Sequence, residues 1–216
     1  SLTTGIFPDK LKVAEVQSVF KKGDKSLLDN YRPISVLPSL SKVFEKVVYG
    51  QLYDYFVSNS LFYKSQHGFK TLHSTETAAL EFVDKILNFL DSGKLPISIY
   101  LDLSKAFDTL DHTILLHKLK YYGLNESSLK WFTSYLTDRH QYVYFEDICS
   151  TSLSFQTGVP QGSILGPLLF IIYSNDMHRA SSKFDSILYA DDTTLINPLC
   201  SFNSSISLEP LRKYKH

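Results

Sequence analysis

Two adjacent carboxylates interrupt a β-favouring stretch near the end of the chain. The sequence is apolar up to Tyr189-Ala190-Asp191-Asp192 and becomes apolar again directly afterwards. Two short β runs separated by acidic turn residues predict a β-hairpin. Neighbouring Asp side chains repel each other unless a hard cation such as Mg²⁺ neutralises them. The stretch therefore predicts either a metal-binding hairpin tip or an ordinary solvated acidic turn.

A third candidate carboxylate lies 89 positions before Asp191. Residues 96–103 alternate between apolar and other side chains, which predicts a strand with three apolar residues on one face and Asp102 on the other. Because strands disfavour Asp, an Asp near the end of a β run is a candidate metal ligand. Asp102 and Asp191 can meet only if the fold brings their strands together.

Length and composition indicate a globular protein of one or two domains, with 216 residues of which 44% are hydrophobic. No apolar run is long enough to span a membrane, and the first residues do not resemble a secretory signal. Two cysteines cannot form a disulfide framework or a four-ligand zinc site. We therefore expect an intracellular protein, nuclear or cytoplasmic, and the initial Ser1 suggests a fragment of something longer.

The formal net charge is zero, but it is unevenly distributed. Residues 1–70 contain ten Lys or Arg against six Asp or Glu, whereas residues 71–216 contain twelve against sixteen. A basic first part and an acidic second part suit a site that binds polyphosphate on one wall and metal on the other. Ordinary surface variation explains the asymmetry equally well. The neutral total argues against strong autonomous binding of nucleic acid.

The periodicity of apolar residues predicts a mixture of helices and strands. Helices are predicted over Leu40–Phe56, from a cap at Thr75 to Gly93, and over about 113–122 and 126–137. The aromatic residues of Leu40–Phe56 are expected to lie in the core. The apolar face predicted for the helix from Thr75 consists of Ala79, Leu80, Val83, Ile86, Leu87 and Leu90. Residues 141–145 and 151–155 are expected to pair as strands around Glu146-Asp147.

Two loops are candidates for contacts with a nucleotide. Lys21-Lys22 and Arg32 flank a turn and could converge on a triphosphate, although basic loops are usually only solvated. Residues 158–170 form a Gly/Pro-rich loop that leads into an apolar helix, with Pro167 in its first turn. Backbone N–H groups at such a helix start can bind a nucleotide. The loop lacks the Gly-Lys-Ser/Thr ending of a P-loop.

Four stretches in a fixed order resemble part of the reverse transcriptases of non-LTR retrotransposons, in particular the jockey/CR1-like group. They are Lys21–Leu37, Tyr100–Asp108, Gly158–Ser163 and Tyr189–Asp192, and the resemblance runs from about residue 5 to residue 197. It implies an α+β right-hand polymerase with fingers and palm, an antiparallel ferredoxin-like or RRM-like palm sheet flanked by helices, and no thumb. The implied division is fingers over about 1–95, palm with part of the fingers over about 96–197, and a truncated tail over 198–216.

The resemblance also implies the catalytic residues. Asp102, Asp191 and Asp192 match the family's catalytic carboxylates, which hold two Mg²⁺ ions, with Mn²⁺ as an alternative metal. Tyr189 and Ala190 complete the motif at the hairpin tip. In the family these metal ions activate the primer 3′-hydroxyl and bind the triphosphate.

Several other residues match positions of the family that contact the nucleotide. Phe107 resembles the aromatic gate that excludes a ribose 2′-hydroxyl; the alternative is a core position, and the resemblance favours the gate. Gln161 and Gly162 resemble the loop beside the incoming nucleotide and template, and Lys22 (or Lys21) and Arg32 resemble cations that bind the triphosphate. The remaining motif positions are Gly68 and Pro160.

The function implied is RNA-directed DNA polymerase, which adds dNTPs to a DNA primer on an RNA template. An upstream endonuclease and a downstream thumb of the parent polyprotein would be absent here, so we expect little activity from this piece alone. Two departures from the family pattern are Lys70, where Arg is commoner, and Ser174, where an apolar residue is usual.

Two other functions fit parts of the sequence. A decayed retroelement remnant would act at most as a nucleic-acid-binding or interaction module. A palm-fold nucleotide cyclase would need neither Phe107 nor the Pro160-Gln161-Gly162 loop.

Overall fold

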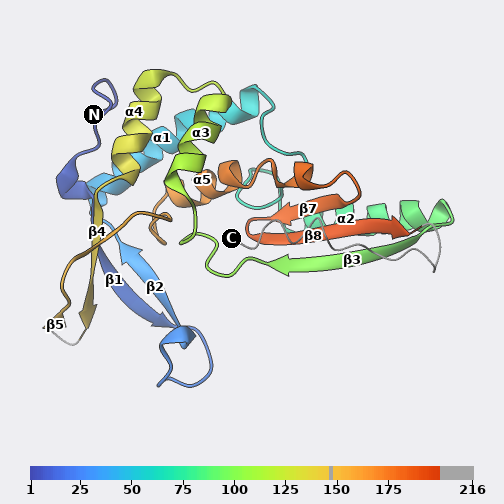
Figure 1. Cartoon of the computed structure of the whole chain (residues 1–216), viewed down its shortest axis with the longest axis horizontal. Helices are drawn as coiled ribbons and strands as arrows, with labels where there is room; N and C mark the ends of the chain where they lie inside the picture. The colour runs from blue at the N-terminus through green and yellow to red at the C-terminus, as the bar shows by residue number, and fades with distance from the viewer. Residues whose placement is uncertain (146–147, 200–216) are drawn as a thin grey trace. The chain divides into compact units, whose positions relative to one another are not determined.

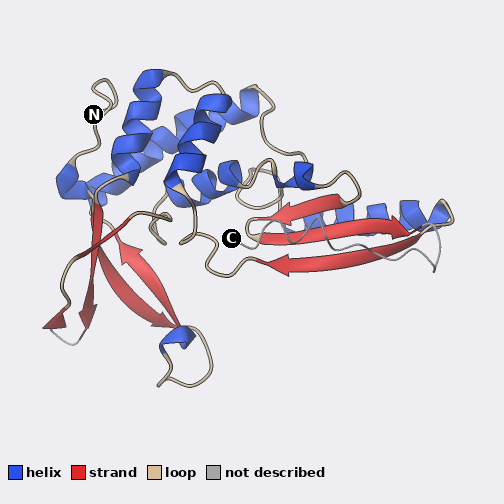
Figure 2. Cartoon of the chain, viewed as in Figure 1, coloured by secondary structure: helices blue, strands red, loops and turns tan. Residues whose placement is uncertain are grey.

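The computed structural model describes residues 1–145 and 148–199, and these residues form two compact units. The first unit contains Ser1–Leu61 and Lys105–Tyr173. The second contains Phe62–Ser104 and the described residues from Ser174 onward. Both units combine helices and strands (Figure 2). The expected fingers and palm boundaries stay predictions. Of the expected tail over 198–216, the first two residues end a strand, and the part from Cys200 on lies outside the described residues.

Four helices build the core of the first unit (Figure 1). They are α1 (Ser39–Ser58), α3 (His112–Tyr121), α4 (Glu126–Leu136) and α5 (Leu165–Tyr173). The first three confirm the helices expected from the apolar periodicity. Helix α5 is almost entirely buried, and both α1 and α3 pack against it. It therefore forms the centre of this core.

The inward face of α1 differs from the expected one. Leu40, Val43 and Val47 are exposed, whereas Glu45 is completely buried. The buried row also contains Ser41, Val48, Leu52 and Phe56. Apolar residues occur on more than one face of this helix, so their periodicity did not identify the buried face. Of the aromatic residues expected in the core, Phe56 is buried and Phe44 is half-buried, whereas Tyr55 is exposed.

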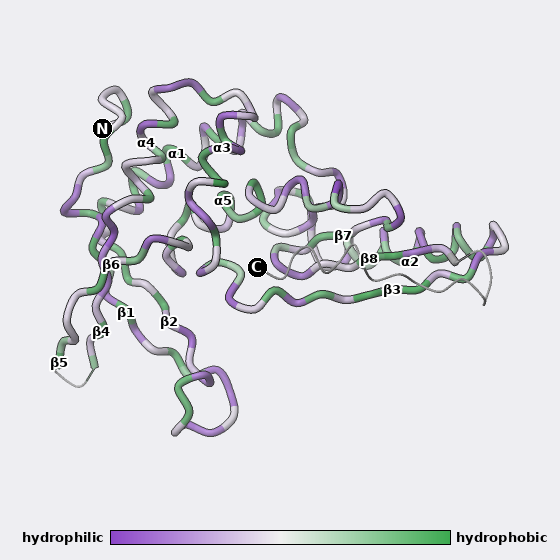
Figure 3. Tube along the Cα trace, viewed as in Figure 1, coloured by the Kyte–Doolittle hydropathy of each residue, from purple (hydrophilic) through white to green (hydrophobic). Residues whose placement is uncertain are grey.

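The sheet of the first unit has strands in the order β2-β1-β4-β5, with β6 also paired to β4. Strands β1 and β4 are parallel, and the other pairs are antiparallel. The loop between β1 and β2 is largely hydrophilic (Figure 3). The predicted pairing of residues 141–145 with 151–155 is confirmed in outline, but Glu146-Asp147 lies outside the described residues. The bounds are β1 (Val13–Phe20), β2 (Tyr31–Val36), β4 (Arg139–Phe145), β5 (Ile148–Cys149) and β6 (Leu153–Phe155), with 3₁₀ turns at η1 (Asp9–Leu11) and η2 (Leu28–Asn30).

The second unit has a three-stranded antiparallel sheet in the order β3-β8-β7. Its strands are β3 (Leu95–Asp102), β7 (Asp185–Tyr189) and β8 (Asp192–Leu199), with a 3₁₀ turn η3 (Met177–Ala180) before β7. Helix α2 (Thr75–Asp91) packs against β3 and β7 (Figure 1). The sheet fixes the relative positions of residues from both ends of this discontinuous unit.

Helix α2 corrects two expectations. Its N-cap is Ser74, not Thr75, and Ser74 forms a capping box with Thr77. Most of the predicted apolar face is exposed and only Ile86 of it is half-buried, because apolar residues surround this helix and a different row faces the sheet. The exposed residues are Ala79, Leu80, Val83, Leu87 and Leu90. No helix among the described residues is long and apolar enough to cross a membrane.

Candidate active site

The predicted hairpin is present in the second unit. Strands β7 and β8 pair from Asp185 to Tyr189, and Tyr189 lies opposite Asp192. Ala190 and Asp191 form the two-residue turn between them. Ala190 has a φ of 56°, in the left-handed region that residues with a side chain usually avoid. The turn therefore needs support from the residues around it.

The third carboxylate lies beside this turn, as expected. Along the antiparallel ladder between β3 and β8, Asp102 is the direct partner of Asp192. Side chains of directly opposed residues stand about 4.5–5.5 Å apart at their Cβ atoms. Asp102 and Asp192 are exposed, and Asp191 is half-buried. The fold thus brings Asp102 beside Asp191 and Asp192, which are adjacent to each other but far from Asp102 in the sequence.

The three carboxylates affect one another electrostatically. Partial burial and the neighbouring charges of Asp191 and Asp102 raise the pKa of Asp192 above its ordinary value. Each of these causes disfavours the ionised form. A cation at this position would relieve the repulsion, so the donor chemistry fits a hard metal ion. No group of three His, Cys, Asp or Glu side chains in the described ranges already has the arrangement of a metal site.

We expect the Asp102→Asn substitution to lower the pKa of Asp192 toward its ordinary value, because it removes one like charge. Carbon-detected NMR titration of the Asp carboxyl groups in the presence of a chelator measures this shift. The Asp185→Asn substitution, at the far end of β7, is the matched control and should leave the titration of Asp192 unchanged. An unchanged Asp192 titration in the Asp102→Asn variant would contradict the charge coupling.

The predicted triphosphate-binding cations all lie on one hairpin of the first unit. Lys22 follows β1 in the loop to β2, and Arg32 lies on β2 opposite Val19. Both side chains are exposed. The Lys21 N–H donates to the Asn30 carbonyl at 2.8 Å, which closes the base of the loop. Lys21 and Lys22 are thus adjacent residues at the start of the loop between the two strands. A role of either lysine in binding the triphosphate stays a prediction.

The exposure of Phe107 is compatible both with a core position and with a gate for the sugar. The residue is half-buried, and its ring centroid lies 4.8 Å from that of the buried Phe170 on α5. Phe107 therefore contributes to packing in the first unit while part of its surface stays accessible. Its role as a gate for the sugar stays a prediction.

The loop Pro160-Gln161-Gly162 is fixed within the first unit. The Ser35 N–H of β2 donates to the Gln161 carbonyl at 2.7 Å, and Gly162 lies so close that a Cβ would be 2.5 Å from the Ser35 oxygen. The Gln161 side-chain amide donates to both carboxylate oxygens of Asp108, at 2.9 and 3.1 Å. Asp108 thus orients Gln161, a role that the sequence did not reveal.

The helix start after this loop does not offer free N–H groups, contrary to expectation. The buried carboxylate of Glu45 accepts the N–H groups of Ile164, at 2.6 Å, and of Leu165, at 3.4 Å. The Ser163 hydroxyl accepts the N–H of Gly166 at 3.0 Å. These internal acceptors satisfy the first turn of α5, so those groups are not available to a nucleotide.

A match to a family model covers residues 19–199, and the family is described as reverse transcriptase (RNA-dependent DNA polymerase). The chain belongs to the reverse transcriptase family. The match includes every catalytic and nucleotide-binding position predicted from the sequence. The predicted family and its enzyme class are thereby confirmed, while the roles of individual residues in this reverse transcriptase domain stay predictions.

Relatives place the reverse transcriptase domain among non-LTR retrotransposon proteins. It is 36% identical over 178 residues to the probable RNA-directed DNA polymerase from transposon X-element of Drosophila melanogaster, covering 79% of this chain and 19% of that protein. It is 31% identical over 203 residues to the RNA-directed DNA polymerase from mobile element jockey of the same species, covering 90% and 22%. The chain therefore spans about a fifth of the length of these relatives.

Solved structures support the expected fold. Apo telomerase from Candida tropicalis, truncated from its C-terminal domain, matches with a TM-score of 0.63 at 17% identity, over 96% of this chain and 47% of that one. Telomerase from the same species in complex with a TWJ fragment of telomeric RNA matches with a TM-score of 0.61 at 14% identity, covering 94% and 38%. At this identity the likeness concerns the fold alone, and it confirms the α+β fingers-and-palm fold.

The two departures from the family pattern, Lys70 and Ser174, both lie in the second unit of the reverse transcriptase domain. Lys70 donates to the Tyr63 carbonyl at 3.3 Å and lies 5.9 Å from the centroid of the Phe62 ring. Burial lowers its pKa, and the Glu81 carboxylate partly offsets this effect. Ser174 is buried, and its carbonyl accepts the Met177 N–H at 3.0 Å. The side chain of Lys70 thus has a local structural role, whereas the Ser174 bond is made by the backbone and does not explain a serine at this position.

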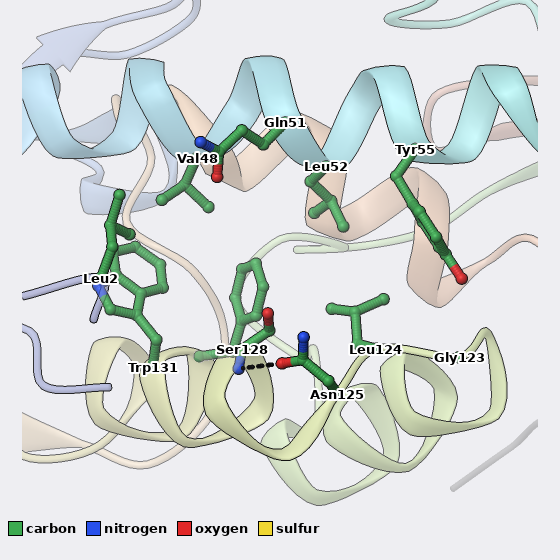
Figure 4. A pocket seen from close by; sticks show the side chains of 11 residues that line it. Leu2, Val48, Gln51, Leu52, Tyr55, Gly123, Leu124, Asn125, Ser128 and Trp131 are labelled. Carbon is green, nitrogen blue, oxygen red and sulfur yellow. Dashed lines mark hydrogen bonds between the residues drawn. The ribbon is translucent and has the colours of Figure 1, made fainter. Parts of the chain in front are cut away.

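A cavity of about 300 Å³ lies between α1 and α4 in the first unit of the reverse transcriptase domain (Figure 4). Val48 and Leu52 line it from α1, and Trp131 lines it from α4. Asn125 caps α4 at its edge by accepting the Ser128 N–H at 2.9 Å. None of the residues predicted to act in catalysis or nucleotide binding lines this cavity.

Proposed function

We propose that this chain carries the polymerase centre of a non-LTR retroelement and transfers deoxynucleotides to the 3′ end of a DNA primer on an RNA template. The direct pairing of Asp102 with Asp192, beside Asp191, is the observation that carries the proposal. Family membership supports the reaction class. The proposed partners are RNA template, DNA primer and dNTPs, with further domains of a larger polyprotein, in an intracellular setting.

Reverse transcriptases use divalent metal ions, and we propose two Mg²⁺ ions for this site, with Mn²⁺ as an alternative. Bound there, they would supply charge neutralisation and Lewis-acid activation for nucleotidyl transfer. Asp102, Asp191 and Asp192 would hold them. Burial and, after it, the like charges of Asp191 and Asp102 raise the pKa of Asp192, and a cation bound there would offset both effects. The strand ladder holds Asp102 and Asp192 together, so the site does not depend on a flexible loop for their position.

Other residues would position the substrates. Lys22 (or Lys21) and Arg32 would bind the triphosphate, with Arg32 able to form bidentate contacts. Phe107 would discriminate against the ribose 2′-hydroxyl by steric exclusion. Gln161, oriented by Asp108, would contact the incoming nucleotide. These assignments combine the family resemblance with the local contacts of each residue in the first unit.

Metal binding by the chain itself provides the first test. Titration with Mn²⁺, followed by electron paramagnetic resonance, should show saturable binding that Mg²⁺ competes away and that Asp102→Asn weakens. The Asp185→Asn variant is the control because Asp185 is exposed on the same hairpin but at its opposite end. Equal binding by all three proteins would count against metal ligation by the paired acids.

A chimera provides the test of catalysis. The chain replaces the matching segment of the jockey polymerase, to which it is 31% identical, and the product is assayed on an oligo-dT primer with a poly-rA template. We expect extension that depends on dNTPs and Mg²⁺. A folded chimera that binds Mn²⁺ but never extends the primer would contradict the proposed reaction.

A further inference from the structure

Gln66 connects a buried segment of the second unit to the hairpin tip. Its side chain is completely buried, and its Oε1 atom accepts the N–H of Gly68 at 2.8 Å and the N–H of Ala190 at 3.1 Å. Two converging donors fix which side-chain atom is the oxygen. The Gln66 Nε2 atom has no hydrogen-bond partner among the described residues. The two bonds to Oε1 therefore account for the polar contacts of this amide.

The Gln66 contact falls on the turn residue with the unfavourable backbone. Ala190, with its φ of 56°, occupies the first turn position of a two-residue hairpin, where Gly is usually favoured. A hydrogen bond from its N–H to a fixed, buried acceptor stabilises this conformation. Asp191 and Asp192 follow directly, so the direction of both carboxylates depends on how Ala190 is held.

Gly68 lies directly against the same turn. A Cβ at this position would lie 2.2 Å from the Ala190 nitrogen and 2.8 Å from its Cα. These distances are far below any normal contact, and both atoms belong to the backbone. Only Gly therefore permits this approach, and it brings the segment against the tip without intervening atoms.

The segment is also bonded to strand β7. The His67 N–H donates to the Leu188 carbonyl at 2.7 Å, and the Leu188 N–H donates to the Ser65 carbonyl at 2.8 Å. Gln66 and Leu188 thus form an isolated parallel bridge at the edge of the sheet. These bonds fix the position of Gln66 along β7, so that its side chain reaches Ala190, two residues after Leu188.

Helix α2 holds the other side of the segment. The Glu81 carboxylate accepts the Ser65 hydroxyl at 2.6 Å and contacts the His67 Nε2 at 2.7 Å, while His67 Nδ1 lies 2.9 Å from the Thr77 hydroxyl. Burial opposes the ionised form of Glu81, but the hydrogen bonds from Ser65 and His67 outweigh it with help from Lys85, and the pKa of Glu81 is lowered. The segment is therefore anchored to a helix on one side and to the hairpin on the other.

We infer that Ser65–Gly68, here named the tip clamp, sets the position of the catalytic hairpin tip and that Gln66 is its positioning residue. Gln66 acts through the Ala190 backbone and touches no reacting group. A role of Gln66 in catalysis rests on the polymerase function proposed above. Its effect on the position of the hairpin tip does not. The tip clamp predicts that losing one acceptor atom disturbs the metal-binding acids without unfolding the unit.

Amide hydrogen exchange at Ala190 tests the clamp directly, by NMR of the chain labelled with ¹⁵N-alanine. In the unmodified protein this amide should be protected although it lies in a turn. The Gln66→Met substitution keeps the length of the side chain but removes the acceptor, and we expect it to accelerate exchange about tenfold. The Gln66→Glu substitution keeps an acceptor oxygen, in either protonation state, and should restore the protection.

The Gln51→Met substitution, at an exposed glutamine on α1, is the matched control and should change neither Ala190 exchange nor metal affinity. In the Gln66→Met protein we expect the dissociation constant for Mn²⁺ to rise about tenfold, as for other residues that orient metal ligands. In the Gln66→Glu protein it should stay close to the original value, which a general loss of stability would not produce.

Two results would overturn the tip clamp. One is rapid exchange of the Ala190 amide in the unmodified protein, a measurement that needs no variant to fold. The other is unchanged exchange in a folded Gln66→Met protein. If instead Mn²⁺ fails to bind the unmodified chain while Ala190 exchange responds as expected, the clamp stands and the proposed metal site fails.

Discussion

Primer extension by the chimera is expected to fall at least about 10³-fold when Asp192 is replaced by Asn, because one carboxylate that neutralises charge during nucleotidyl transfer is lost. The side chain keeps its size, so the β3–β8 ladder should form as before. Asp102→Asn should cause a loss of similar size. Single-nucleotide extension under saturating dNTP and Mg²⁺ measures both.

The double variant Asp102→Asn/Asp192→Asn shows whether the two carboxylates act together or contribute independently to primer extension. Residues that act as one unit give losses that do not multiply, so the double variant should be about as inactive as either single variant. Asp185→Asn, the exposed control on β7, should keep its activity. If an Asp192→Asn chimera retained more than about a tenth of the original rate, the paired acids would not be the catalytic centre.

The free energy of unfolding of the first unit is expected to fall by about 3 kcal/mol in the Glu45→Ala variant, because buried donors then lack an acceptor. The carboxylate serves the first turn of α5 and also accepts the Ser41 hydroxyl at 3.0 Å. It lies near the buried Arg139, whose pKa is lowered by burial and partly restored by the nearby Tyr135 and Glu45. Removal of Glu45 therefore leaves both N–H groups without an acceptor and removes one of the two groups that offset the burial of Arg139.

Urea unfolding followed by fluorescence measures this loss, since the single Trp131 is buried in the same unit. Glu45→Gln keeps one acceptor and should lie between Glu45→Ala and the unmodified protein. Asp54→Ala is the control because Asp54 is an exposed carboxylate on the same helix. Equal unfolding midpoints for Glu45→Ala and Asp54→Ala would show that the buried carboxylate does not stabilise α5.

The positions of the three candidate carboxylates on a hairpin and a strand could be predicted from the sequence because their signals are local. The β runs around Asp191 predicted the hairpin, and alternation placed Asp102 on a strand. Their meeting depended on which strands pair, and here the family resemblance supplied what periodicity could not. The observed pairing of Asp102 with Asp192 agrees with that expectation.

The faces of α1 and α2 and the supporting polar residues could not be predicted in the same way. Both helices carry apolar residues on more than one side, so periodicity alone did not separate the packed face from the exposed one. Glu45, Gln66 and Asp108 are polar residues whose partners lie elsewhere in the chain, and Gln66 meets Ala190 across 124 positions. Such contacts leave no pattern in the neighbouring sequence.

The register of the ladder between β3 and β8 determines where insertions and deletions are tolerated. They should be less tolerated inside these two strands than in the chain that connects them. Adding or removing one residue inside β3 would turn Asp102 to the opposite side of the sheet, because side chains alternate. A two-residue change would restore the side but shift the carboxylate by about 6.6 Å along the strand. Natural length variation in relatives should therefore fall between the two strands, in the long stretch from Leu103 to Lys183, and spare the strands themselves.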